Sequence, residues 1–125
     1  MLTDKIILTD KPLNWTSTDV VRFLKKSLSL KKVGHAGSLD PRATGLLILC
    51  TDRMTKKINE FMDYEKEYHG IIKIGARTRS FDTETEEEDF KDVSKVSDEM
   101  IENARSSFLG VTEQVPPMHS AIKLN

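Results

Sequence analysis

The chain has 125 residues, of which 38% are hydrophobic and 31% charged, and its formal net charge is −1. This length and composition are those of one ordinary globular domain with a core of its own. No apolar run approaches the roughly 20 residues of a membrane-spanning helix. The single cysteine excludes an internal disulfide framework. We therefore expect a cytoplasmic protein that does not associate with membranes.

Charge is distributed unevenly along the chain. Residues 1–79 carry 15 Lys and Arg against 9 Asp and Glu, a net charge of +6, whereas residues 80–125 carry 4 against 11, a net charge of −7. The first part can therefore present a basic face to a nucleic acid. An acidic surface loop beside an ordinary mixed surface explains the same counts equally well.

The first part of the chain is expected to alternate strands and helices. Residues 6–9 form a short apolar run that predicts a strand ending in a turn. A helix capped by Thr16 or Ser17 is expected to continue to about Leu28, because apolar residues recur there at helical spacing. Residues 33–41 contain two glycines and a proline and predict a loop.

Residues 45–51 are a continuous apolar run and predict a strand buried on both faces. Residues 55–62 predict a helix, and the looser alternation of residues 67–76 predicts a further strand. Residues 82–92 contain seven acidic residues without periodicity and predict an exposed loop.

Near the end of the chain, Ser97 is expected to cap a helix that continues to Phe108, with Gly110 just past its end. Prolines in residues 114–123 predict an extended segment. The residues expected to face the core from the helices at 55–62 and 97–108 are Ile58, Phe61, Met62, Met100, Ile101, Ala104 and Phe108. Strands and helices mix without strict alternation, so the predicted class is α+β.

Few residues point to chemistry by their own spacing. His35, His69, His119 and Cys50 lack the spacing of metal ligands, so we expect no metal site. The glycines near His35 lack the ending of a phosphate-binding loop. Asp40 stands in a loop before a buried strand, a common place for catalysis. Aspartate before proline is also a usual turn residue, and the residues alone favour that explanation.

Residues 34–45, however, closely resemble a family signature. They read Gly-His-Ala-Gly-Ser-Leu-Asp-Pro-Arg-Ala-Thr-Gly, and the signature G-H-x-G-x-L-D-P-x-A-T-G belongs to the TruB type of pseudouridine synthases, which act on uridine 55 of tRNA. Four further segments resemble the family's motifs D-K-P-x-G-x-T-S, G-x-A-T-K, K-x-Y and Q-x-P-P-x-Y-S-A-x-K in order and spacing. They are residues 10–17, 53–56, 66–68 and 114–123. Asn14 replaces the glycine of the first of these, and Asn tolerates the left-handed backbone that glycine would adopt there.

The resemblance implies a mixed β-sheet flanked by helices, as in pseudouridine synthases, with residues 1–125 as the amino-terminal portion of the catalytic domain. Family members continue into further strands, a T-Y-I-R segment whose arginine pairs with the catalytic aspartate, and often an RNA-binding domain. The 125 residues do not contain these segments, so we expect the chain to be a fragment, a truncated gene product or one piece of a larger molecule. Without that arginine, turnover by the chain alone is not expected.

By the same resemblance, the chain isomerises uridine 55 in the T-arm loop of tRNA without a cofactor, as a monomer that does not act on DNA. Asp40 is the implied nucleophile. Tyr68 is implied to stack on the flipped uracil, His35 to fill the space that the base leaves, and Asp82 to contact the base or orient a partner. Each residue also has a purely structural explanation. Tyr68 could be a strand aromatic that faces the core, His35 could satisfy loop backbone groups, and Asp82 could be a plain acidic loop residue. The candidates for phosphate contacts are Lys31, Lys32, Arg42, Arg53 and Lys56.

Other functions remain open on the sequence. One is the related enzyme that modifies ribosomal RNA under a guide RNA. The short segment before Asp10 argues weakly against it. A non-catalytic RNA-binding module and an inert folding fragment are the remaining alternatives.

Overall fold

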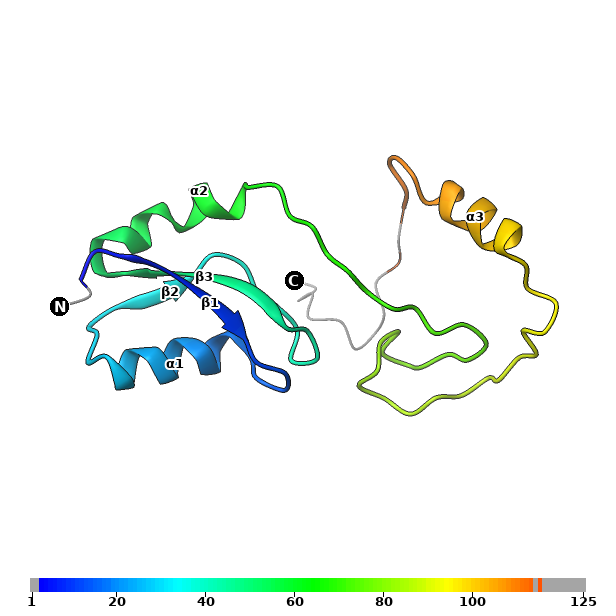
Figure 1. Ribbon diagram of the computed structural model, residues 1–125, viewed down its shortest axis with the longest axis horizontal. Helices are drawn as coiled ribbons and strands as arrows, with labels where there is room; N and C mark the ends of the chain where they lie inside the picture. Colours follow the sequence, from blue (N-terminus) through cyan, green and yellow to red (C-terminus); the bar gives the residue numbers. More distant parts are fainter. Residues whose placement is uncertain (1–2, 114, 116–125) are drawn as a thin grey trace. The chain divides into compact units, whose positions relative to one another are not determined.

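The computed structural model describes residues 3–113 and 115 of the chain (Figure 1). The chain divides into two compact units, residues 1–68 and 69–125, and each is described by itself. Among the described residues, the first unit contains a sheet with helices, and the second contains one helix among irregular segments. The candidate nucleophile lies in the first unit.

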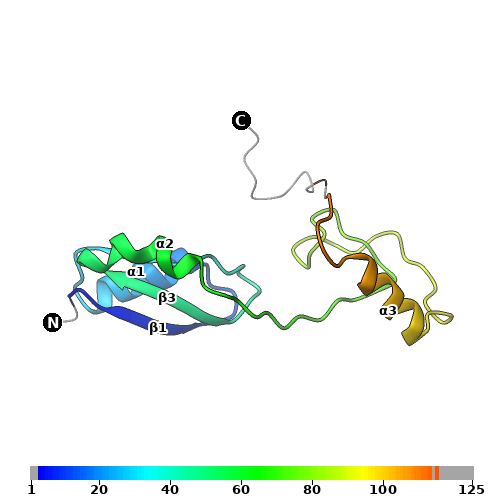
Figure 2. The same cartoon turned by 90° about the horizontal axis from the view of Figure 1, so that it is seen from above.

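The sheet of the first unit has three strands, β1 (Ile6–Lys11), β2 (Val33–His35) and β3 (Gly45–Thr51), in the order β1-β3-β2. The apolar strand β3 is central and pairs with a neighbour on each side, as Figure 2 shows for β1. Lys11 pairs with Gly45, so the end of β1 meets the start of β3.

The α+β class is confirmed, but both strand pairings among the described residues are antiparallel. The family resemblance had implied a mixed sheet, whereas the sheet of the described residues is entirely antiparallel. Burial on both faces holds for most of β3, whereas Leu46 near its start is exposed.

Helix α1 (Ser17–Ser27) packs on one face of the sheet and begins at the predicted residue. Thr16 is the N-cap, and its side chain and that of Asp19 form a reciprocal capping box. Val20 of α1 is buried against Leu47 and Leu49 of β3, which makes this face the core of the unit. The alternation of β1 turns its odd-numbered residues, including Lys11, toward the same face.

The 3-10 helix η1 (Asp52–Lys57) and helix α2 (Ile58–Met62) follow β3 directly. Gly34 of β2 lets α2 approach, because a Cβ there would lie 2.7 Å from Cδ1 of Ile58. Gly34 pairs with Cys50, whose side chain alternates to the face opposite Leu49, so α1 and α2 contact different faces of the sheet (Figure 1).

In the second unit, helix α3 (Asp98–Ser107) begins after the predicted cap, Ser97, whose side chain accepts a hydrogen bond from the backbone N–H of Met100. Gly110 has a φ of +87° just past the end, as predicted for a glycine that ends a helix. The acidic residues 82–92 are irregular and largely exposed, which confirms the predicted loop. Its one described bridge joins Arg77 to Glu88.

Two predictions of local structure were wrong. Residues 33–35 belong to strand β2 and not to a loop, because they pair with the end of β3. Residues 67–76 form no ladder with any described residue, and Ile71 is fully exposed at 101%. An apolar alternating run becomes a strand only where a neighbour supplies hydrogen bonds.

The predicted inner sides of the later helices are also largely exposed. Met62 of α2 is exposed, as are the apolar residues of α3 and Phe108 after it. A helical period shows which residues share a face, but burial requires another element against that face. The extended segment predicted for residues 114–123, including His119, lies outside the described residues apart from residue 115.

Candidate active site

The loop that carries Asp40 joins β2 to β3 at the end of the sheet where β1 finishes (Figure 1). Gly45, the first residue of β3, has a φ of +123°, a conformation that residues with a side chain rarely adopt. Glycine at this position therefore allows the loop to turn directly into the strand. At the same point, Oδ1 of Asp10 accepts a hydrogen bond of 3.0 Å from the backbone N–H of Gly45.

The side chain of Asp40 is exposed to solvent. Its backbone oxygen accepts a hydrogen bond of 3.0 Å from the N–H of Ala43, which closes a turn. Within residues 3–113 and 115, no hydrogen bond or ion pair engages the carboxylate. Burial in the core would have excluded a nucleophilic role, and the structure shows no such burial.

Both neighbours of Asp40 are held by the stretch that leads from β1 into the first residue of α1. The backbone N–H of Leu39 donates to Oγ of Ser17 at 2.9 Å. The backbone oxygen of Pro41 accepts a hydrogen bond of 2.7 Å from the N–H of Asn14. The main chain is thus anchored immediately before and immediately after the candidate nucleophile.

Lys11 completes this anchoring from inside the unit. Its side chain is fully buried, at 0% exposure. Nζ donates to the backbone oxygens of Trp15 at 2.6 Å, Pro12 at 3.1 Å and, more distantly, Pro41 at 3.4 Å. An ammonium group has three N–H donors, so the three carbonyl oxygens account for all of them. Charged groups are rarely buried unless paired in this way.

The backbone of Asn14 has the left-handed conformation predicted for the position, with a φ of 65°. This turn brings its N–H to the backbone oxygen of Pro41, so asparagine at this position is compatible with the turn. Sequence reasoning matched residues 10–17 to a family motif and predicted a helix cap there, but assigned none of them a role at the active site. The motif was itself the available signal, because Lys11, Asn14 and Ser17 all lie within it.

His35, at the end of β2, is half-buried. Its Nδ1 lies 2.6 Å from the backbone oxygen of Gly37. Since a carbonyl oxygen can only accept, Nδ1 is the donor in this hydrogen bond. The histidine therefore satisfies a loop backbone group, which was the structural alternative to a functional role. That it also fills the space of a flipped base stays a prediction.

Tyr68, the last residue of the first unit, is 70% exposed and lies outside any strand. The alternative of a strand aromatic facing the core is therefore wrong. Asp82, in the second unit, accepts hydrogen bonds from Oγ of Ser80 at 2.6 Å and the N–H of Glu84 at 2.8 Å. These two hydrogen bonds, of which the one from Ser80 has the larger effect, hold the pKa of Asp82 below its ordinary value.

The predicted phosphate-binding cations are all exposed. Arg42 lies two residues after Asp40 in the same loop, whereas Lys56 lies in η1. Lys31 and Arg53 line one pocket of the first unit. Its lining residues are Thr3, Asp4, Leu28, Ser29, Leu30, Lys31, Asp52 and Arg53.

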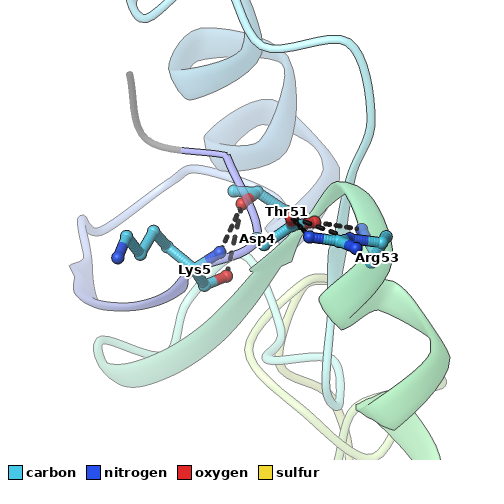
Figure 3. A network of polar contacts seen from close by, with 4 residues as sticks. All are labelled: Asp4, Lys5, Thr51 and Arg53. Atoms are coloured by element: carbon cyan, nitrogen blue, oxygen red, sulfur yellow. Dashed lines mark hydrogen bonds and ion pairs between the residues drawn. The ribbon is translucent and has the colours of Figure 1, made fainter.

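Arg53 has a partner within the chain (Figure 3). Its Nε and Nη2 both donate to Oδ2 of Asp4, at 2.9 and 2.6 Å, and its backbone N–H donates to Oδ1 at 2.9 Å. This forked contact holds the pKa of Asp4 below its ordinary value and raises that of Arg53. Beside it, hydrogen bonds between Lys5 and Thr51 attach the start of the chain to the end of β3.

The residues that the structure describes contain no group of three or more His, Cys, Asp and Glu side chains that could hold a metal ion. In the same part of the chain, no helix is both long enough and apolar enough to cross a membrane. The site described so far therefore consists of Asp40 and the groups that position its loop.

Residues 25–125 match the protein family described as TruB family pseudouridylate synthase, N-terminal domain. The chain belongs to the TruB family. It is 49% identical to tRNA pseudouridine synthase B of Chlorobaculum tepidum over 120 residues, which are 93% of this chain and 50% of that protein. It is 44% identical to tRNA pseudouridine synthase B of Flavobacterium johnsoniae over 129 residues, covering 98% of this chain and 56% of that protein.

The chain thus spans about half the length of the curated relatives that it matches. One solved structure, of an H/ACA RNP bound to a substrate RNA containing 2′-deoxyuridine, is also similar in part. The match covers 44% of this chain and 17% of the chain in that structure, with 40% sequence identity and a TM-score of 0.43.

Proposed function

We propose that this chain carries the nucleophile of a tRNA pseudouridine synthase that isomerises uridine 55 in the T-arm loop. The observation that carries the proposal is the exposed Asp40, in the TruB signature, on a loop anchored on both sides. Membership of the TruB family, and relatives named tRNA pseudouridine synthase B along nearly the whole chain, support it. The protein acts as a cytoplasmic monomer on RNA and not on DNA.

The proposed reaction needs a nucleophile and no cofactor. The bond between N1 of uracil and C1′ of ribose breaks, the base turns, and C5 forms the new bond to C1′. C5 then loses its proton and N1 gains one, so that the product is an isomer of the substrate. Asp40 attacks either C1′, where it displaces N1, or C6 of the base, and a carboxylate is competent for both routes. In each route the bond to Asp40 breaks again before the product leaves, so the carboxylate is regenerated. An arginine from the remainder of the catalytic domain keeps that carboxylate ionised.

The target uridine reaches Asp40 only after it leaves the stacked RNA loop. Extrusion costs a few kcal/mol, which stacking and edge contacts in the active site offset. The exposed ring of Tyr68 is available to stack on the uracil and to take part in removal of the C5 proton. His35 fills the space that the base leaves, and Asp82 contacts the base or orients a partner.

The exposed cations contact the phosphates of the T-arm. Lys31, Lys32, Arg42 and Lys56 act as point charges, and Arg53 contributes less because Asp4 already binds two of its nitrogen groups. Affinity for RNA should therefore fall as salt rises. The fold of the T-arm and the extruded nucleotide, rather than base sequence along the stem, provide recognition.

The proposal is tested in the complete gene product with a T-arm stem-loop RNA. Formation of pseudouridine at position 55 is expected for the wild type and should be lost in Asp40→Asn. Asp63→Asn, which changes another exposed aspartate of the first unit, is the matched control and should retain activity. An Asp40→Asn protein that still forms pseudouridine, or a covalent adduct with 5-fluorouridine RNA, would remove Asp40 from its role.

A further inference from the structure

Ser17 is a buried residue, 4% exposed, at the first position of α1. Its Oγ accepts a hydrogen bond of 2.9 Å from the N–H of Leu39 and donates one of 3.3 Å to the oxygen of the same residue. A hydroxyl has one donor and two acceptor positions, so a single side chain can serve both groups. Both backbone polar groups of the residue before Asp40 are thus bound by one side chain.

The helix does not require this hydroxyl. Thr16 accepts a hydrogen bond from the N–H of Asp19, and the carboxylate of Asp19 accepts from the N–H of Thr16, so the capping box satisfies the helix start without Ser17. The hydroxyl of Ser17 is directed instead at a loop 22 residues further along the chain.

The carboxylate of Asp40 has no hydrogen bond or ion pair within the part of the chain that the structure describes. Within these residues, the main chain of the loop therefore determines where the Cβ of Asp40 lies, and no described side chain restrains the carboxylate beyond it. Lys11 and Asn14 hold that main chain only after Asp40, through the backbone oxygen of Pro41. A loop anchored on one side could still rotate, so a second anchor is needed before Asp40.

We propose that Ser17 is a positioning residue of the isomerisation, whose hydroxyl fixes the backbone of Leu39 and thereby the direction of the Asp40 carboxylate. This inference rests on the proposed function. A displacement of about 1 Å at a reacting group can lower a rate roughly 100-fold. Loss of the hydroxyl should therefore lower the rate of the bound complex without weakening RNA binding.

Ser17→Ala is compared with Thr9→Val in the complete protein. Thr9 is the matched control, because its hydroxyl donates to the backbone oxygen of Leu47 at 3.1 Å, within the same unit but away from the loop. We expect Ser17→Ala to lower kcat roughly 10- to 100-fold, with the Kd for T-arm RNA unchanged. Thr9→Val should lower thermal stability to a similar extent and leave kcat near that of the wild type. If kcat is equal in the two variants, Ser17 is not a positioning residue.

Hydrogen exchange of the Leu39 amide separates this inference from the proposed function. The amide should be protected in the wild type and in Thr9→Val, and it should exchange rapidly in Ser17→Ala. If it exchanges equally fast in all three proteins, the anchor does not exist. If protection behaves as expected but the wild type forms no pseudouridine, the proposed function fails while the anchor stands. Should Ser17→Ala not fold, Ser17→Cys replaces it with a weaker donor of similar size.

Discussion

Replacement of Lys11 by methionine tests the buried anchor of the Asp40 loop. Methionine keeps a flexible, unbranched side chain but removes the ammonium group, so the packing of the long chain is largely preserved. The oxygen of Pro41 retains its hydrogen bond of 2.7 Å from the N–H of Asn14, and that of Pro12 retains one of 3.4 Å from the N–H of Trp15. The oxygen of Trp15 has no other hydrogen bond among the described residues.

The expected loss of folding stability has two sources. The backbone oxygen of Trp15 is left without a partner, and the hydrogen bonds from the charged Nζ of Lys11 are removed. An unsatisfied acceptor costs about 1–3 kcal/mol when it is fully buried, which is an upper limit for the part-buried bond of Trp15, and hydrogen bonds to a charged group contribute about 1.5–3 kcal/mol. The desolvation of the ammonium, which the variant no longer requires, offsets part of this sum. We therefore expect Lys11→Met to lower the free energy of unfolding by about 2 kcal/mol.

Urea unfolding of the complete protein measures this loss. With a slope of about 2 kcal/mol per molar urea, the midpoint should fall by about 1 M. Lys5→Met is the matched control, because Lys5 is exposed and, among the described residues, hydrogen bonds reach only its backbone groups (Figure 3). That control should stay within about 0.5 kcal/mol of the wild type. Equal midpoints for the two variants would show that the buried ammonium does not hold the loop.

Three further variants, at two positions, test the turn and the ion pair of the first unit. Asn14→Ala should cost about 1 kcal/mol, because alanine is strained at a φ of 65°. Asn14→Gly should be nearly neutral, and equal losses in urea unfolding would contradict this. The hydrogen bonds from Arg53 lower the pKa of Asp4 in the folded protein. The ion pair therefore stabilises the fold fully above pH 3.8, the ordinary pKa of aspartate, and this stabilisation is lost as the pH falls through the lowered pKa of the folded state. The difference in unfolding midpoint between wild type and Asp4→Asn should therefore shrink on acidification, and a pH-independent difference would refute the assignment.

The elements that sequence reasoning placed correctly have strong local signals. Helix α1 has a cap, a helical apolar period and basic residues in its last turn, all within a dozen residues. Strand β3 is an uninterrupted apolar run of strand length. Such signals depend on neighbours along the chain, so they can be recognised without knowledge of the fold.

Where prediction failed, the deciding contact came from elsewhere in the chain. Residues 33–35 look like part of a glycine-rich loop, yet they become β2 because β3 offers a free edge. Residues 67–76 alternate like a strand, yet no described strand pairs with them. A strand is a property of two segments, and one segment alone cannot establish it.

The sequence by itself determined the family of the chain and the aspartate to examine, because a twelve-residue signature needs no coordinates to be read. Only the tertiary structure decided how that aspartate is held. Ser17 and Lys11 reach Leu39 and Pro41 across 22 and 30 residues of chain. Periodicity and propensity describe neighbours within a few residues, whereas these hydrogen bonds form only after the sheet has brought the end of β1 to the start of β3.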